Sequence, residues 1–250
     1  MIRSFIAIIS SAWWCGLAVV VLMISPKSSD FVLIKLAKKY WSAPLIKWIV
    51  GVDLEVQINP KTQALLNSGK GAVLMANHSS FLDINVAFAA CPAPIVFLAK
   101  ASIRKIPLLG GANARVGTVF VERGNKKSAR VAISTLVETI KNGRCVLVFP
   151  EGTRSDKGSG EIRPFKKGGF HLAFKANAPV IPVYFDGVGP LLPKGHFAIR
   201  RNTNSTRKVK VIFGAPIIDE KHSVTSLKDE CYESLKAISQ ARTKPSLIAR

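Results

Sequence analysis

Acidic residues are scarce in this chain of 250 residues: Asp and Glu number 15, against 36 Lys and Arg, and the formal net charge is +21. A surplus of that size indicates an anionic partner, such as nucleic acid, an anionic lipid surface, or an acidic substrate or carrier protein. Charge alone does not choose among them. Hydrophobic residues make up 48% of the chain, which argues against a disordered polypeptide.

Cysteine is also sparse, and its spacing is uninformative. The chain has no CxxC pair and no Cys/His ligand spacing, because its cysteines stand far apart at Cys15, Cys91, Cys145 and Cys231. This pattern argues against a disulfide framework or a zinc site and favours a reducing, cytosol-facing compartment.

Three well-known motifs are missing. The sequence contains neither a GxSxG nucleophile elbow nor a GxxxxGK[ST] phosphate loop. Gly187-Val188-Gly189 is followed by Pro190-Leu191-Leu192, where a dinucleotide fingerprint would need a further glycine. These absences argue against a serine hydrolase, a nucleotidase and a dehydrogenase.

A long uncharged run opens the chain, from Phe5 to Ile24. About 20 such residues are enough to cross a bilayer. The run ends in Ser25-Pro26-Lys27 rather than in a small-residue cleavage site, which predicts an uncleaved anchor. Lysines follow the run, so the positive-inside tendency places the rest of the chain in the cytoplasm.

A second apolar segment, Phe31–Val50, contains regularly spaced polar residues. The three- and four-residue spacing of these residues predicts one helical face that lies in the membrane interface and contacts anionic lipid phosphates: Lys35, Lys38, Lys39 and Ser42. The alternative is a solvated face on a helix packed against the next domain. Whether the first run spans the bilayer or both helices enter one leaflet stays open. Residues 1–50 are predicted to anchor the chain and residues 51–250 to form the catalytic domain.

Beyond Gly51, strand-like runs alternate with amphipathic segments, which predicts an α/β domain with helices on both faces of its sheet. The predicted strands are Leu54–Ile58, Ala72–Ala76, Ile95–Ala99, Thr118–Val121, Cys145–Phe149, Val180–Tyr184 and Val209–Phe213. The predicted helices are Phe81–Cys91, Asn125–Asn142, Gly169–Asn177 and Val224–Arg242.

A candidate catalytic pair follows the second of these strands, in Asn77-His78-Ser79-Ser80-Phe81-Leu82-Asp83. On one regular helix His78 and Asp83 would point well apart. They can pair if His78 lies on the loop and Asp83 one turn into the helix, with Asn77 to Ser80 capping the helix start. The carboxylate would then fix the tautomer of the imidazole, which would serve as a general base. A capping cluster that happens to contain a histidine explains the pattern equally well.

Basic residues stand at the ends of three other strands. Arg154 follows one strand in Phe149-Pro150-Glu151-Gly152-Thr153-Arg154-Ser155, Arg123 ends Gly117-Thr118-Val119-Phe120-Val121-Glu122-Arg123, and Lys100 closes a third strand. Arginine is suited to gripping phosphate in two hydrogen bonds. If these strand ends converge with the histidine loop, the result is a base beside a cationic pocket, which fits a substrate with a hydroxyl and a phosphate.

In these blocks the chain resembles the glycerolipid acyltransferases, within them the bacterial enzymes that acylate lysophosphatidate. The family's NHxxxxD block reads NHSSFLD, its GxxFxxR block reads GTVFVER, and its FPEGTRS block is intact. VIPV at Val180–Val183 and PFKKG at Pro164–Gly168 also match, so the resemblance covers roughly residues 50 to 215. Glu122 is a mild departure, since close relatives often have Asp there.

The resemblance implies a mixed central sheet flanked by helices and transfer of an acyl group from a thioester, either acyl-CoA or acyl carrier protein, to the sn-2 hydroxyl of lysophosphatidic acid. His78 would be the base and Asp83 its orienting partner. The acceptor site would comprise Lys100, Arg123, Glu151, Gly152, Thr153 and Arg154. Backbone N–H groups near Gly152 or Val180–Val183 could bind the oxyanion. Neither a metal nor a bound cofactor is needed.

Other readings stay open. A different lyso-lipid acceptor, such as lyso-ornithine lipid, would use the same chemistry. A covalent route through Ser79, Ser80 or a cysteine is disfavoured, because neighbours at a helix start rarely face each other. A nucleic-acid-binding protein would explain the charge, but the basic residues are not interleaved with aromatics, so no nucleic-acid partner is expected. A basic membrane scaffold would explain the helices but leave the histidine and arginine blocks as coincidence.

Overall fold

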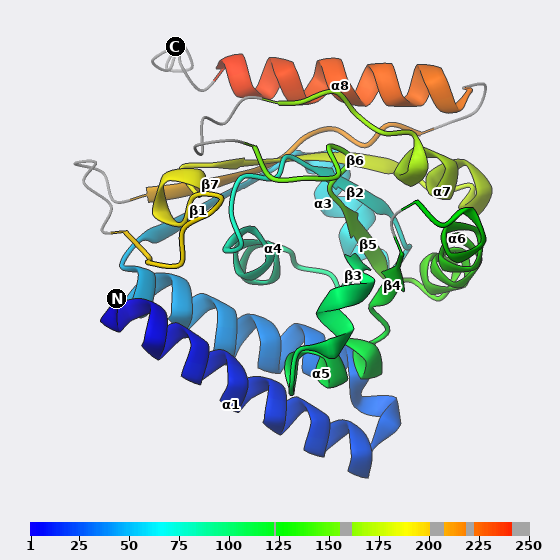
Figure 1. The fold of residues 1–250 in the computed structure, drawn as a ribbon. Coiled ribbons are helices and arrows are strands. Elements are labelled where there is room, and N and C mark those ends of the chain that lie inside the picture. Colours follow the sequence, from blue (N-terminus) through cyan, green and yellow to red (C-terminus); the bar gives the residue numbers. More distant parts are fainter. Residues whose placement is uncertain (123, 156–161, 201–207, 219–222, 242–250) are drawn as a thin grey trace.

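The computed structural model describes residues 1–122, 124–155, 162–200, 208–218 and 223–241. Its centre is a seven-stranded sheet in the order β1-β7-β6-β2-β5-β3-β4 (Figure 1). The strands are β1 Asp53–Ile58, β2 Val73–Ala76, β3 Ile95–Lys100, β4 Val119–Val121, β5 Cys145–Val148, β6 Val180–Asp186 and β7 Lys208–Phe213. All seven predicted strands are therefore confirmed, with ends that differ by one or two residues.

The sheet is mixed, as expected. Strands β6, β2, β5, β3 and β4 run parallel to one another, whereas β7 is antiparallel to β6 and parallel to β1. Every residue of β2 and β5 is buried. Central parallel strands covered on both faces read as continuous apolar runs, which is why Val73–Ala76 and Cys145–Val148 could be recognised.

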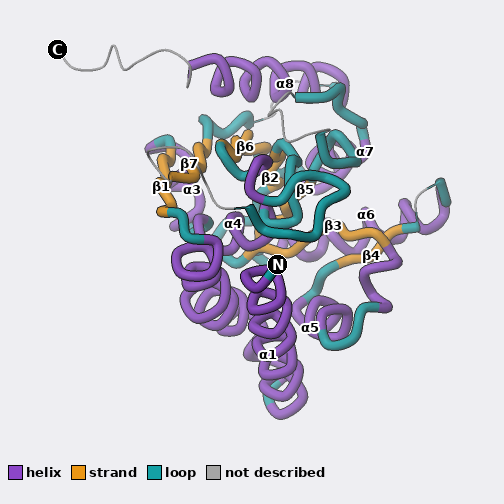
Figure 2. The backbone as a smooth tube through the Cα atoms, turned by 60° about the vertical axis from the view of Figure 1, so that its left-hand side comes forward, coloured by secondary structure: helices purple, strands orange, loops and turns teal. Residues whose placement is uncertain are grey.

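Helices cover both faces of the sheet. On one face lie α6 (Lys126–Lys141), α7 (Gly168–Ala176) and α8 (Val224–Ala241), which contact one another and the strands. On the other face lies α4 (Asp83–Ala90), with the N-terminal helices beneath it (Figures 1 and 2). All four predicted helices are confirmed within two residues at each described end, and Arg242 lies outside the described residues.

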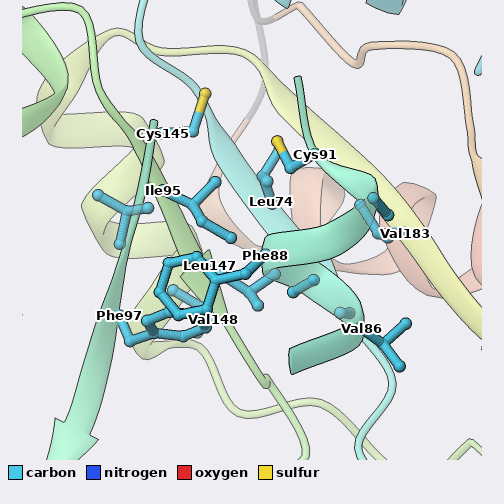
Figure 3. Close-up of a cluster of buried hydrophobic side chains, with 14 of the residues drawn as sticks. Leu74, Val86, Phe88, Cys91, Ile95, Phe97, Cys145, Leu147, Val148 and Val183 are labelled. Carbon is cyan, nitrogen blue, oxygen red and sulfur yellow. The ribbon is translucent and has the colours of Figure 1, made fainter. Parts of the chain in front are cut away.

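The apolar core between α4 and the sheet is shown in Figure 3. Phe88 of α4 packs edge-on against Phe97 of β3, with ring centroids 5.1 Å apart. Leu74 and Leu147, from the two central strands, are almost fully buried in the same cluster. This packing fixes the first residue of α4 relative to the ends of β2 and β5.

Two helices were not predicted. Helix α3 (Pro60–Asn67) begins at Asn59, whose side chain accepts a hydrogen bond from the backbone N–H of Lys61. Its Asn-Pro start is a regular helix signal, but its mixed composition concealed it. Helix α5 (Leu109–Val116) contains Gly110 and Gly111, which have low helix propensity, and forms against α1.

The N-terminal segment is a helical hairpin that lies along the α/β domain. Helix α1 (Ile2–Ile24) is long and apolar enough to cross a membrane and is mostly exposed. After the short turn η1 (Pro26–Ser28), the chain returns as α2 (Ser29–Phe31), η2 (Val32–Ser42) and η3 (Leu45–Val50), the latter two in π-helical turns. A helix pair over residues 1–50 was predicted; the π-helical geometry was not.

The expectation of one lipid-facing stripe on the second helix is wrong in part. Lys35 and Lys39 are exposed, but Lys38 is half-buried and its Nζ donates to the carbonyl oxygen of Cys91 at 2.9 Å. Ser42 is fully buried, and its hydroxyl accepts from Asn85 Nδ2 of α4 at 3.4 Å. The i→i+5 turns of a π-helix rotate each residue by less than an α-helix does, so the four residues divide between two faces.

Candidate active site

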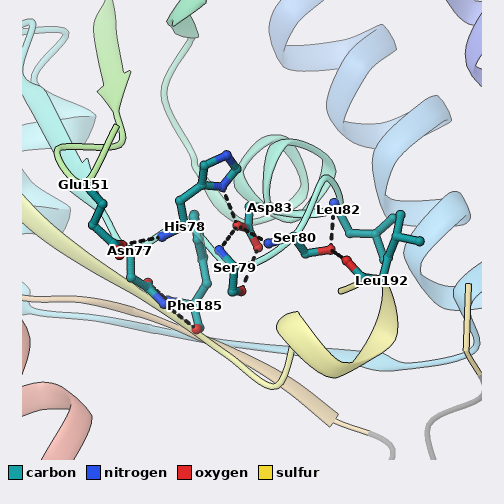
Figure 4. Close-up of polar contacts among 9 residues, drawn as sticks. All are labelled: Asn77, His78, Ser79, Ser80, Leu82, Asp83, Glu151, Phe185 and Leu192. Carbon is teal, nitrogen blue, oxygen red and sulfur yellow. Dashed lines mark hydrogen bonds and ion pairs between the residues drawn. The ribbon is translucent and has the colours of Figure 1, made fainter. Parts of the chain in front are cut away.

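The imidazole of His78 is paired with the carboxylate of Asp83. Their Nδ1 and Oδ2 atoms lie 2.8 Å apart, and Asp83 is fully buried whereas His78 is 18% exposed (Figure 4). A carboxylate at Nδ1 holds the proton there and leaves the lone pair on Nε2. No described residue is hydrogen-bonded to Nε2. The pair is therefore arranged as a general base open to a substrate.

The route to this pairing differs from the expected one. Asp83 is the first residue of α4 rather than a residue one turn into it. Its Oδ2 also accepts from the backbone N–H groups of Ser79 and Ser80, at 2.7 and 2.9 Å. The loop residues do not cap α4, which lacks a side-chain cap. Instead, the Asp83 carboxylate accepts hydrogen bonds from backbone N–H groups of the loop.

Residues after β5 hold the backbone of His78 on both sides. Glu151 Oε1 accepts from the backbone N–H of His78 at 2.8 Å, and the N–H of Ser155 donates to the carbonyl oxygen of His78 at 2.7 Å. The ring of Phe149 stacks on the imidazole, with centroids 3.9 Å apart and planes at 16°. Because β2 and β5 are adjacent and parallel, their carboxyl ends bring these two loops together.

Glu151 is a buried carboxyl with two backbone donors. Its second oxygen, Oε2, accepts from the N–H of Arg163 at 3.2 Å. Burial raises the pKa of Glu151 from 4.5 to about 7, although both donors oppose the shift. The charge of Asp83 adds to the rise. Glu151 thus connects the histidine loop to residues that follow the FPEGTRS block, and its charge changes near neutral pH.

Asn77 fastens the other side of the histidine loop. Its Oδ1 accepts from the N–H of Phe185 at 2.7 Å, and its Nδ2 donates to the carbonyl oxygen of Phe185 at 3.0 Å. The side-chain amide thus continues the β2–β6 pairing beyond the last strand residue (Figure 4). His78 is consequently held from β5 and from β6.

Arg154 lies beside this pair. Its guanidinium stacks over the ring of Phe81, with Cζ 3.7 Å from the centroid. Burial lowers the pKa of Arg154, and the charge of Asp83 opposes the change. Its buried Nη1 has no hydrogen-bond partner among the described residues. A buried guanidinium N–H without a partner is costly, and an anionic ligand would satisfy it.

The other predicted acceptor residues lie at differing distances from the base. Gly152 and Thr153 are half-buried in the Glu151 loop. Gly152 adopts a φ of +69°, and a Cβ there would lie 2.9 Å from Lys166 Nζ, so the lysine chain runs directly over it. Lys100 is exposed at the end of β3, two strands from β2, which is roughly 10 Å. Arg123 lies outside the described residues.

Several residues of the site were not singled out from the sequence. Phe149 and Lys166 stood within recognised blocks without an assigned role, Asn77 was expected only to cap the helix start, and Arg163 was not considered. The side-chain types of Asn77 and Lys166, beside the histidine and within a basic run, were usable signals. No signal in the sequence indicated the backbone hydrogen bond of Arg163 to Glu151.

The alternative nucleophiles are poorly placed. The hydroxyls of Ser79 and Ser80 are buried and directed to Asp83 Oδ1 and the carbonyl oxygen of Leu192, at 3.4 and 2.9 Å. Burial raises the pKa of the Cys145 thiol to about 11. A thiol with so high a pKa is a weak nucleophile at neutral pH. These contacts favour direct attack by the acceptor over a covalent route.

Two of the backbone N–H groups suggested as oxyanion donors are already hydrogen-bonded. The N–H of Gly152 donates to the carbonyl oxygen of Phe149 at 3.0 Å, and that of Val180 donates to Ile217 at 3.0 Å. Both are turn or bridge hydrogen bonds within the fold. Among the described residues, no group of three His, Cys, Asp or Glu side chains could hold a metal ion.

With this geometry in place, similarity to known proteins decides the family. An acyltransferase family model matches residues 57–186, which includes the histidine loop and the Glu151 loop. The chain belongs to this acyltransferase family. It is similar to the 1-acyl-sn-glycerol-3-phosphate acyltransferase of Saccharomyces cerevisiae, at 30% identity over 78% of this chain and 63% of the relative. A relative of that name from Borreliella burgdorferi is 28% identical over 76% of this chain and 75% of the relative.

A solved structure matches the whole fold. The crystal structure of the 1-acyl-sn-glycerophosphate (LPA) acyltransferase PlsC from Thermotoga maritima superposes with a TM-score of 0.77, over 98% of this chain and 97% of that chain. At 24% identity this likeness concerns the fold. The chain spans between 49% and 63% of the first curated relatives' own lengths.

Proposed function

We propose that the protein transfers a fatty acyl group from a thioester donor to the sn-2 hydroxyl of 1-acyl-sn-glycerol-3-phosphate, giving phosphatidic acid. The observation that supports this most is the His78–Asp83 pair, which leaves Nε2 open beside a guanidinium with an unpartnered N–H. The names of the relatives point to the same acceptor.

In this mechanism Nε2 of His78 removes the proton from the acceptor hydroxyl as its oxygen attacks the thioester carbonyl. Asp83 accepts the Nδ1–H throughout and stabilises the imidazolium. When the tetrahedral intermediate collapses, the C–S bond breaks and the imidazolium returns its proton to the leaving thiolate. General base catalysis of this kind contributes roughly 10²–10⁴ in rate.

The acceptor phosphate is assigned to Arg154, with Arg123 and Lys100 as further cationic groups. Fixing the phosphate would align the sn-2 hydroxyl near Nε2 and remove orientational entropy from the barrier. The stacked position of Arg154 on Phe81 supports this role, because it restricts the guanidinium before the ligand arrives. Glu151 is assigned to hold the loop that contains His78 in a fixed position relative to the loop that contains Arg154. No metal or bound cofactor takes part.

The donor is acyl-CoA or acyl carrier protein. Both are anionic and would be attracted to a chain with a net charge of +21. Purified enzyme supplied with each donor at equal concentration would separate them.

We place the protein on the inner membrane with its catalytic domain in the cytoplasm, and its hairpin in one leaflet. The start of α1 is fastened to the domain, where Ser4 Oγ accepts from the N–H of Ile199 at 2.8 Å, and to the returning helix, where Arg3 Nη1 donates to the carbonyl oxygen of Val50 at 3.0 Å. Helix α1 also contacts α5, and beyond its end Asp30 of α2 pairs with Arg144 Nε at 2.8 Å. These contacts support a hairpin that lies along the domain rather than an α1 that crosses the bilayer away from it.

The test is acceptor choice. Membranes containing the protein, supplied with labelled acyl-CoA or acyl carrier protein, should form labelled phosphatidate from lysophosphatidate. Lyso-ornithine lipid, offered alone and in competition, is the comparison acceptor. Faster acylation of lyso-ornithine lipid would contradict the proposed acceptor while retaining the chemistry. Absence of product from every acceptor would contradict the enzyme assignment.

A further inference from the structure

The segment between β6 and β7 exposes an aromatic side chain that the proposed reaction does not use. Phe197 is 85% exposed, the highest value for any described aromatic residue. It follows a β-turn in which the N–H of His196 donates to the carbonyl oxygen of Pro193 at 3.1 Å. Gly195 supplies the φ of +83° that such a turn needs. A ring this exposed on a turn is accessible to a surface outside the protein.

This turn lies against the N-terminal end of α1. Ile199, two residues after Phe197, donates its N–H to Ser4 Oγ in the first turn of α1. Two residues of chain reach about 8 Å at most, so Phe197 lies near that end of the helix. The exposed apolar residues there include Ile2, Phe5, Ile6 and Ile9, at 77%, 65%, 46% and 53%. The ring therefore adds to an apolar surface that begins on α1.

The charge of the turn fits a phospholipid surface. Between Leu192 and Arg200 the sequence LPKGHFAIR contains Lys194, His196 and Arg200 and no acidic residue. All three basic residues are exposed. An aromatic ring flanked by cations is the arrangement that proteins place at the level of lipid headgroups.

The same segment contacts the catalytic loop. Ser80 Oγ donates to the carbonyl oxygen of Leu192 at 2.9 Å, and the N–H of Ser80 donates to Asp83 Oδ2 (Figure 4). Both Ser80 and Leu192 are buried. The turn begins at Pro193, the residue after Leu192, so it directly adjoins the hydrogen bonds around the Asp83 carboxylate.

We infer that residues 193–200 form a second membrane contact, in which Phe197 inserts among the headgroups of an anionic bilayer beside α1 and sets the acceptor's path to His78. The inference rests on the proposed membrane-bound acyl transfer and extends it. The hairpin anchors the protein, and the turn fixes the orientation of the active-site edge towards the lipid surface.

Site-selective labelling tests the contact. All four native cysteines are buried, so a cysteine introduced at position 197 can be modified with an environment-sensitive dye. Vesicles containing phosphatidylglycerol should shift the emission of the Phe197→Cys adduct to the blue, and pure phosphatidylcholine should shift it less. The matched control is Phe174→Cys, an exposed phenylalanine on α7 on the other side of the sheet, whose adduct should not respond. An Ile9→Cys adduct reports binding through α1.

The outcomes distinguish a second membrane contact at Phe197 from membrane binding through α1 alone. A response at Ile9→Cys without one at Phe197→Cys overturns the second contact and leaves membrane binding intact. Responses at neither position overturn both. An equal response at Phe174→Cys also overturns the inference, because it would show general adsorption.

Kinetics give an independent readout. Phe197→Ala should raise the apparent KM for lysophosphatidate presented in vesicles about tenfold, as expected when one aromatic contact with the bilayer is lost. The KM for a short-chain, water-soluble acceptor should not change, and Phe197→Trp should retain wild-type behaviour. An equal change with both acceptors would contradict a membrane role for the turn.

Discussion

The backbone N–H of His78 donates to Glu151 Oε1 at 2.8 Å, although 73 residues separate the two in the chain. The same carboxyl accepts from the N–H of Arg163, so one buried side chain joins the histidine loop to the residues after the FPEGTRS block. The position of the candidate base therefore depends on a carboxyl group that needs no contact with either substrate.

Replacing Glu151 with Gln should lower kcat, because the amide has one acceptor oxygen where the carboxyl has two. One of the two backbone N–H groups would lose its partner, which costs about 1–3 kcal/mol when it is buried. We expect a decrease in kcat of at least tenfold, measured at saturating acceptor. An unchanged kcat would contradict the positioning role.

The same variant should alter the pH dependence of stability. The folded protein holds the Glu151 proton up to about pH 7, whereas the unfolded chain releases it near pH 4.5. Glu151 thus contributes stability that is fully present below pH 4.5 and lost as pH rises through 7. The Tm of the wild-type protein should fall more than that of Glu151→Gln between pH 5 and 8. Parallel Tm curves would contradict the raised pKa.

Asp83→Asn preserves the shape of the side chain and removes its charge. The amide oxygen can take the place of Oδ2, but the amide NH2 group cannot accept from Ser79 Oγ as Oδ1 does, and the imidazolium loses its stabilising anion. We expect kcat to fall by about 10² or more. The acceptor KM should change little, and circular dichroism should show retained secondary structure. A variant with near-normal kcat would exclude Asp83 as the partner of the base.

Arg154→Ala should mainly weaken acceptor binding. Loss of hydrogen bonds to a charged phosphate, about 1.5–3 kcal/mol, corresponds to a KM increase of roughly 10- to 100-fold. Arg154→Lys keeps the charge but cannot present two parallel N–H groups or stack flat on Phe81, so it should recover only part of the loss. A decrease in kcat with unchanged KM would instead assign Arg154 to the transition state.

The sequence predicted the strands better than the placement of the side chains around the site. Central strands such as Cys145–Val148 can be recognised as continuous apolar runs, because both of their faces are buried. Helix α5 could not be found in this way, since its two glycines are tolerated only because α1 packs against it. The prediction that Lys38 faces the membrane interface was wrong, because it assumed α-helical periodicity where the chain forms π-helical turns.

Within the site, local spacing indicated that His78 and Asp83 could pair, and the structure brings them together by a loop that starts α4 later than expected. The contacts of Glu151 and Asn77 were beyond prediction. They depend on the strand order β6-β2-β5, which places Phe185 and Glu151 on opposite sides of the histidine loop. Strand order is a long-range property that no spacing in the sequence encodes directly.

The most direct test of the central claim compares phosphatidate formation by wild-type protein and His78→Ala, using labelled thioester donor and lysophosphatidate. Without the imidazole, the acceptor hydroxyl loses the base that removes its proton, so turnover should fall by about 10²–10⁴ while folding and vesicle binding persist. Retention of more than about a tenth of wild-type turnover would contradict general base catalysis by His78.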